Sequence, residues 1–147
     1  MALVQVILVG TDPALVAAWS SEFAAYPAVH VLHGSIFDSD ANTLVSPANS
    51  FGIMDGGLDG KLRDYFGDSV EKVVRERIRE QFHGELPVGL ATVVETGHVR
   101  HPYLISAPTM RYPADVSHTV NAYLAMKATL HAAAAHPAQL RIAIPGF

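Results

Sequence analysis

Short hydrophobic runs alternate with segments of helical periodicity along the whole chain. The apolar runs predict strands at residues 4–9, 29–32, 43–46, 91–95, 103–106 and 140–144. The first run is continuous and rich in β-branched residues, which is typical of a strand covered on both faces. We therefore expect a sheet buried between layers of helices.

Three intervening segments carry apolar residues at helical spacing and predict helices at 13–26, 69–82 and 119–136. The clearest is 69–82, where Val70, Val74 and Ile78 share one face and the charged residues lie elsewhere. Asp12 and Pro13 are a typical N-cap and first helical residue for the 13–26 segment. The alternation predicts a three-layer α/β/α fold with a mixed, mostly parallel central sheet.

Composition narrows the class of protein. The chain of 147 residues, 50% apolar and 16% charged, suits one compact domain spanning 1–147. A net charge of −4 argues against generic binding to nucleic-acid backbone, and the lack of cysteine excludes thiolate metal sites. The N-terminal apolar run is too short to span a bilayer and has no cationic flank. We expect a cytoplasmic protein without a membrane partner.

The chemistry-bearing segment follows the strand at 43–46. Four glycines, Asn49, Asp55 and Asp59 fall between residues 47 and 60. Glycines let the backbone approach a ligand and turn its N–H groups toward an anion. Asn49 lies at the carboxyl end of this strand, where open α/β sheets place their ligand crevices.

This segment resembles the macrodomain family, which binds ADP-ribose and in some members cleaves it from proteins or nucleic acids. The family's Asn-Ala-Ala-Asn-like segment corresponds to residues 46–49 (Ser-Pro-Ala-Asn), and its glycine loop to residues 56–60 (Gly-Gly-Leu-Asp-Gly). The resemblance implies that Asn49 bonds the distal ribose and that Asp59 positions a water at the anomeric carbon. An amide can bond vicinal hydroxyls, and a carboxylate can orient water beside an acetal carbon.

The implied site draws on several segments. The implied catalytic residues are Asn49 and Asp59, and the implied ligand-binding residues are Ser35, Ile36, Ala48, Asn49, Gly52, Gly56, Gly57, Leu58 and Gly146. The implied partner is ADP-ribose or a related nucleotide, free or attached to protein or nucleic acid. We expect no cofactor and no metal.

The chain departs from the family pattern in three places. Ser35 stands where the family has an Asp that contacts adenine, and Asp38 or Asp40 are alternatives for that role. Met54 and Asp55 replace two of the usual glycines. The family continues past the position of Gly146 with a second phosphate loop and a terminal helix, so we expect this domain to lack both.

Simpler interpretations of the same residues remain open. Asn49 is also a common turn or capping residue, and Asp59 could be a solvated carboxylate. His98 and His101 are better explained by a connector than by a metal pair. Arg111 and Tyr112 follow another strand, and either residue could contact ligand or only pack at the rim.

Three functions fit the pattern. The first is hydrolysis of an ADP-ribosyl linkage, or of a derivative such as the 1″-phosphate. The second is non-catalytic recognition of ADP-ribose or a related nucleotide. The third is a structural module of the same fold without a ligand.

Overall fold

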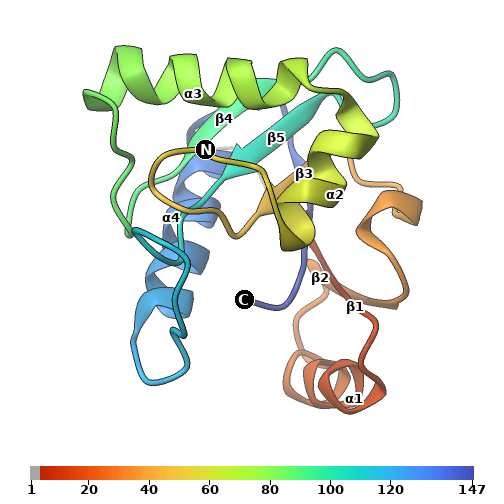
Figure 1. The fold of residues 1–147 in the computed structure, drawn as a ribbon. Helices are drawn as coiled ribbons and strands as arrows, with labels where there is room; N and C mark the ends of the chain where they lie inside the picture. Colours follow the sequence, from red (N-terminus) through yellow and green to blue (C-terminus); the bar gives the residue numbers. More distant parts are fainter. Residues whose placement is uncertain (1–3) are drawn as a thin grey trace.

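The computed structural model describes residues 4–147, which form one six-stranded sheet flanked by helices (Figure 1). The strands are β1 (Gln5–Gly10), β2 (Val29–His33), β3 (Thr43–Ser46), β4 (Thr92–Glu95), β5 (Tyr103–Ser106) and β6 (Arg141–Ile144). The helices are α1 (Pro13–Glu22), α2 (Gly57–Phe66), α3 (Ser69–Phe82) and α4 (Asn121–Ala135), with a short 3₁₀ helix η1 (Ile36–Asp38). All six predicted strands are present, within a residue of their expected bounds.

The sheet is mixed and mostly parallel, as the sequence predicts. Its strand order is β2-β1-β6-β3-β5-β4. β1 pairs in parallel with β2 and β6, and β3 pairs in parallel with β6 and β5. β4 alone runs antiparallel, against β5 at one edge. The carboxyl ends of five strands therefore meet along one edge of the sheet.

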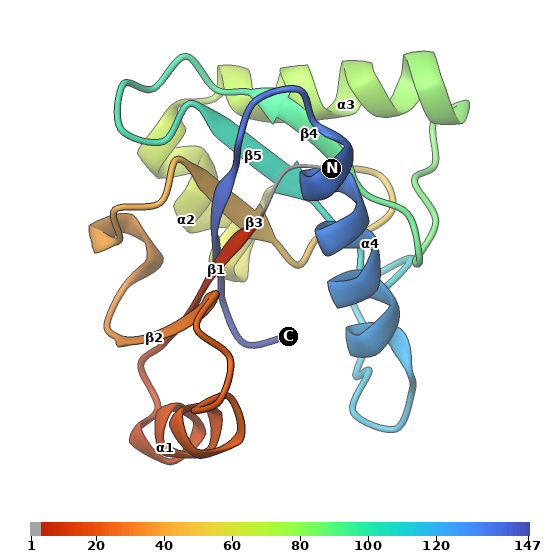
Figure 2. The ribbon, with the colours of Figure 1, turned by 180° about the vertical axis from the view of Figure 1, so that it is seen from behind.

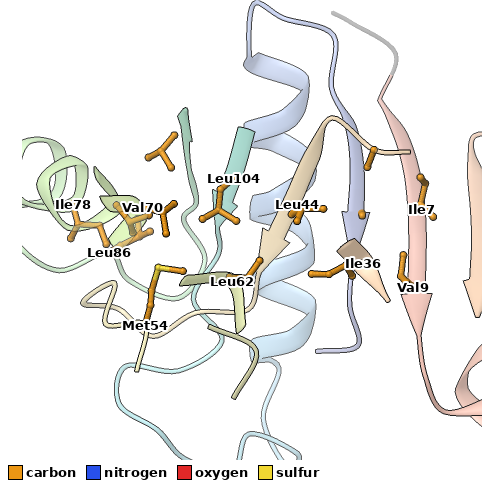
Figure 3. Packing of buried hydrophobic residues seen from close by; sticks show 14 residues of the cluster. Ile7, Val9, Ile36, Leu44, Met54, Leu62, Val70, Ile78, Leu86 and Leu104 are labelled. Atoms are coloured by element: carbon orange, nitrogen blue, oxygen red, sulfur yellow. The ribbon is translucent and has the colours of Figure 1, made fainter. Parts of the chain in front are cut away.

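Helices cover both faces of the sheet. Figure 1 looks onto the face of the sheet covered by α2 and α3. Figure 2 views the molecule from the opposite side and shows α4 on that face. Under α2 and α3, buried side chains such as Leu62 and Ile78 pack against Leu44 and Leu104 of the sheet (Figure 3). On the opposite face, residues of α1 and α4 pack against a second set of strand residues that includes Val45 and Ile105. These two apolar layers hold the strand ends in fixed positions.

Helix α2 is the main element that the sequence did not predict. We expected residues 56–60 to form a loop, but the structure begins a helix at Gly57. Glycine disfavours helix by about 1 kcal/mol relative to alanine, so local propensity argues against this helix. Tertiary packing stabilises it, because Leu62 is fully buried against the core.

The other helices follow the sequence pattern more closely. The Asp12 carboxylate accepts a hydrogen bond from the Ala14 amide at 3.0 Å and caps α1. Helix α3 has the predicted bounds and ends at His83, which adopts the left-handed conformation with φ 56°. No helix formed by residues 4–147 combines the length and apolar character that a bilayer crossing requires.

Candidate functional site

Two clefts lie beside the carboxyl ends of the parallel strands, where α/β sheets usually bind ligands. The Asn49 cleft has a volume of about 390 Å³. It is lined by Pro47, Ala48, Asn49, Ile53, Asp55, Gly56, Gly57, Leu58, Asp59, Met110 and Pro113. The Ser35 cleft has a volume of about 430 Å³. It is lined by Val9, Gly10, Thr11, Asp12, Leu15, Gly34, Ser35, Ile36, Phe37, Leu58, Lys61, Pro145 and Gly146.

The structure divides the expected ligand-binding residues between these two clefts. The Asn49 cleft brings together Ala48, Asn49, Gly56, Gly57, Leu58 and Asp59. The Ser35 cleft brings together Ser35, Ile36, Leu58 and Gly146. Leu58 lines both, so the two clefts adjoin at the first turn of α2.

Gly52 lies in neither cleft, contrary to the expectation that its amide faces the ligand. Its backbone has φ +68°, and a Cβ built there would lie 2.9 Å from Val74 Cγ1 and 3.0 Å from Ile78 Cδ1. The residue is buried against α3. Glycine is therefore required at this position for backbone conformation and packing.

The Asn49 side chain shapes the loop that follows β3. Its Oδ1 accepts hydrogen bonds from the amides of Phe51 at 3.0 Å and Ile53 at 3.2 Å. Its Nδ2 donates to the Ile53 carbonyl at 2.8 Å. This is the turn-forming use of Asn that the sequence left open, and it leaves one N–H of the amide available to a ligand.

The loop after β5 packs against the loop after β3 and extends the parallel pairing of the two strands. Thr109 N donates to the Ala48 carbonyl at 3.0 Å, and Asn49 forms an isolated parallel bridge with Met110. Arg111 lies over the rings of Phe51 and Tyr112, at 5.4 and 4.8 Å from their centroids, and pairs with Glu85. Arg111 thus packs at the rim, while Met110 and Pro113 line the cleft itself.

Asp59 projects from the first turn of α2 toward the end of β3. Ser46 Oγ donates a hydrogen bond to Asp59 Oδ1, and the Asp59 side chain is half-buried. Burial raises the pKa of Asp59; the Ser46 bond opposes this shift, and Asp55 and Glu71 add to it. A carboxylate with a raised pKa in a cleft is suited to accept a proton from water.

Sequence reasoning missed two charged residues of the Ser35 cleft. Asp12 and Lys61 both line it, from the N-cap of α1 and from α2. Ser35 Oγ accepts from Phe37 N at 3.2 Å and caps η1, whereas Asp40 pairs with Arg141 at 3.0 Å. A signal for Asp12 existed, because it follows a strand that ends at the same edge as β3.

His98 and His101 belong to a packed cluster at the other end of the sheet. His101 is fully buried; its Nδ1 lies 2.7 Å from the Tyr65 hydroxyl, and its Nε2 lies 3.2 Å from the Ser39 carbonyl. Burial lowers the pKa of His101. Within residues 4–147, no three His, Asp or Glu side chains form a group that could hold a metal ion.

Comparison with known proteins identifies the family. The family model described as the Macro domain matches residues 45–147, which include the end of β3, all of α2 and the Asn49 cleft. The chain belongs to the Macro domain family. This macrodomain is also 33% identical over 119 residues to an uncharacterized protein of Aquifex aeolicus, covering 81% of this chain and 68% of the relative. It is 33% identical over 79 residues to a macro domain-containing protein of Cupriavidus necator, covering 54% of this chain and 44% of that protein.

Solved structures agree on the fold. The macrodomain of Thermus aquaticus DarG aligns with a TM-score of 0.64 and 17% identity, over 98% of this chain and 79% of that one. The Oceanobacillus iheyensis macrodomain with ADP aligns with a TM-score of 0.55 and 15% identity, over 76% of this chain and 78% of that one. The expectation of a macrodomain fold is therefore confirmed.

Proposed function

We propose that this macrodomain binds ADP-ribose across the two clefts and hydrolyses an ADP-ribosyl linkage with a water positioned by Asp59. Membership of the Macro domain family supports the choice of ligand. The Oceanobacillus iheyensis macrodomain was solved with ADP, and a substituted form of it with ADPR. The observation that carries the hydrolytic part is the half-buried Asp59 carboxylate, held by Ser46 at the wall of the Asn49 cleft.

The N-terminus of α2 supports the position we propose for the ligand. The first intrahelical bond runs from Gly60 N to Gly56 O at 3.0 Å, so the amides of residues 57–59 have no partner within the helix. Such amides, with the positive end of the helix dipole, favour phosphate groups. The diphosphate would lie beside Leu58, with the adenosine in the Ser35 cleft and the distal ribose in the Asn49 cleft.

In the proposed reaction, Asp59 accepts a proton from the attacking water as the water oxygen bonds to the anomeric carbon. The bond from the anomeric carbon to the leaving group breaks, and the leaving group departs with the electron pair and takes a proton back from Asp59 or from solvent. The free N–H of Asn49 orients a distal ribose hydroxyl. The raised pKa of Asp59 makes it a stronger base than an exposed carboxylate.

A second candidate function is non-catalytic recognition of ADP-ribose. It is favoured by the three hydrogen bonds that the Asn49 side chain makes to its own loop, because they leave little capacity to orient a ribose for attack. The two candidates predict the same binding and differ in turnover.

The test combines titration calorimetry with a hydrolysis assay on wild type, Asp59→Asn and the control Asp64→Asn, whose residue is exposed on the same helix and lines neither cleft. ADP-ribose should bind, and AMP and ribose 5-phosphate should bind more weakly. Asp59→Asn should keep its affinity within a few fold and lose turnover by about 10²–10⁴-fold. Binding without turnover in wild type would favour the reader, and absence of ADP-ribose binding would refute both candidates.

A further inference from the structure

Three buried hydroxyl groups lie side by side at the ligand edge of the sheet. In register, Ser46 of β3 faces Ser106 of β5, and Ser106 faces Thr92 of β4. Their exposed fractions are 2%, 2% and 5%. Register partners on neighbouring strands point to the same face, about 4.8 Å apart. We call these three residues the hydroxyl row.

The hydroxyl row interrupts an apolar face. Two residues earlier on the same strands, Leu44 and Leu104 are fully buried beneath α2 and α3. Burying a hydroxyl is unfavourable unless it forms a hydrogen bond, so a packing role would be better served by an apolar side chain. The row therefore needs a polar partner on α2 or α3.

Asp59 is that partner. Ser46 Oγ donates to Asp59 Oδ1 across the gap between the sheet and α2. Because a serine hydroxyl has a single proton, Ser46 can then only accept from its neighbours. Ser106 Oγ is buried and has no hydrogen-bond partner within residues 4–147, so its proton is available to Ser46.

We propose that Ser46, supported by Ser106, is the positioning residue of Asp59. Ser46 Oγ holds Oδ1 against the sheet and turns the second carboxylate oxygen toward the Asn49 cleft. Ser106 donates to Ser46 through one bridging water, because Ser106 Oγ has no direct partner among residues 4–147, and this fixes the direction in which Ser46 donates. The consequence for catalysis rests on the proposed function, whereas the positioning itself does not.

The first experiment is a ¹³C NMR titration of the Asp59 carboxyl group in the full chain. In Ser46→Ala the carboxylate loses a donor, and the pKa of Asp59 should rise by about one to two units. Ser46→Thr, which keeps the hydroxyl, should titrate like wild type. Ser106→Ala should give a smaller rise, and the control Ser20→Ala, on an exposed turn of α1, should give none.

The second readout is the pH profile of ADP-ribosyl hydrolysis. Its acidic limb should move to higher pH in Ser46→Ala by the same amount as the NMR titration, while the Kd for ADP-ribose stays within about threefold. A residue with only a structural role would change the level of activity without moving this limb.

The outcomes separate the two proposals. An Asp59 titration that is unchanged in Ser46→Ala overturns the positioning role. If Ser46→Ala does not fold, Ser46→Cys provides the same comparison with a weak donor of similar size, and an unchanged titration there also overturns it. A shifted titration in a protein that hydrolyses no ADP-ribosyl linkage supports the positioning and refutes the proposed hydrolysis.

Discussion

Gly52→Ala should destabilise this macrodomain strongly without touching either cleft. Gly52 has φ +68°, a conformation that costs a residue with a Cβ roughly 1–2 kcal/mol. The new Cβ would also lie 2.9 Å from Cγ1 of Val74, a fully buried residue with a stiff side chain. Overpacking of this kind costs about 1–3 kcal/mol. The unfolding free energy should therefore fall by about 2–5 kcal/mol.

Gly57→Ala is the matched control. Gly57 also has a left-handed φ, of +55°, but nothing lies within 4 Å of a Cβ placed there. Only the conformational cost applies, so the expected loss is about 1–2 kcal/mol. The two variants differ in packing and share the backbone requirement.

Urea denaturation of both variants, monitored by circular dichroism, measures the difference. In thermal melts, each kcal/mol should lower the Tm by about 2–4 °C for a domain of this size. Equal losses in the two variants would refute the packing argument. A Gly52→Ala variant of wild-type stability with impaired ADP-ribose binding would instead restore the ligand-contacting role expected from sequence.

Three further predictions concern charged groups. Burial raises the pKa of Asp59 above the usual value of 3.8, so the folded protein loses stability as pH rises above 3.8 and the buried carboxyl group has to ionise. Asp59→Asn should therefore raise the Tm at pH 7, and this gain should shrink toward pH 3. Burial lowers the pKa of His101 below the usual value of 6.5, so the unfolded chain takes up a proton more readily than the folded one and the Tm of wild type should fall as pH drops below 6.5. His101→Gln should reduce this dependence of the Tm on pH in thermal melts between pH 7 and 5. Arg77→Met removes the bond from Arg77 Nη1 to the Val93 carbonyl on edge strand β4, at 2.8 Å; urea denaturation should show a loss of about 1.5–3 kcal/mol.

The sequence predicts the sheet well because buried strands are continuous apolar runs and the helices that cover them have apolar residues at helical spacing, and both patterns are visible locally. It fails at α2, where three glycines within 56–60 suggest a loop and the burial of Leu62 imposes a helix. Burial against residues distant in the chain cannot be read from a local pattern. The misassigned role of Gly52 has the same origin, since its neighbours Val74 and Ile78 lie on α3.

The candidate site was predictable only to the level of segments. Strand ends indicate which loops meet at one edge, and from them the sequence predicts one site that contains Ser35, Asn49, Asp59 and Gly146; the structure divides these residues between two adjoining clefts. Which polar atoms bond one another depends on the exact path of each loop. The sequence therefore could not choose between a ribose ligand and a turn former for Asn49, nor identify the bond between Ser46 and Asp59.

Leu58 lies against both clefts, and this has a consequence for how ligands combine. A molecule that occupies both clefts consists of two fragments whose connecting bridge passes the Leu58 side chain. Once the first fragment is bound, the second is held near its own cleft at a high effective concentration. We expect each fragment alone to bind weakly and the affinity of the whole molecule to depend on the length of the bridge between the fragments. Under the proposed placement of ADP-ribose, the size of the residue at position 58 should then limit which bridge fits, independently of the groups that recognise either end.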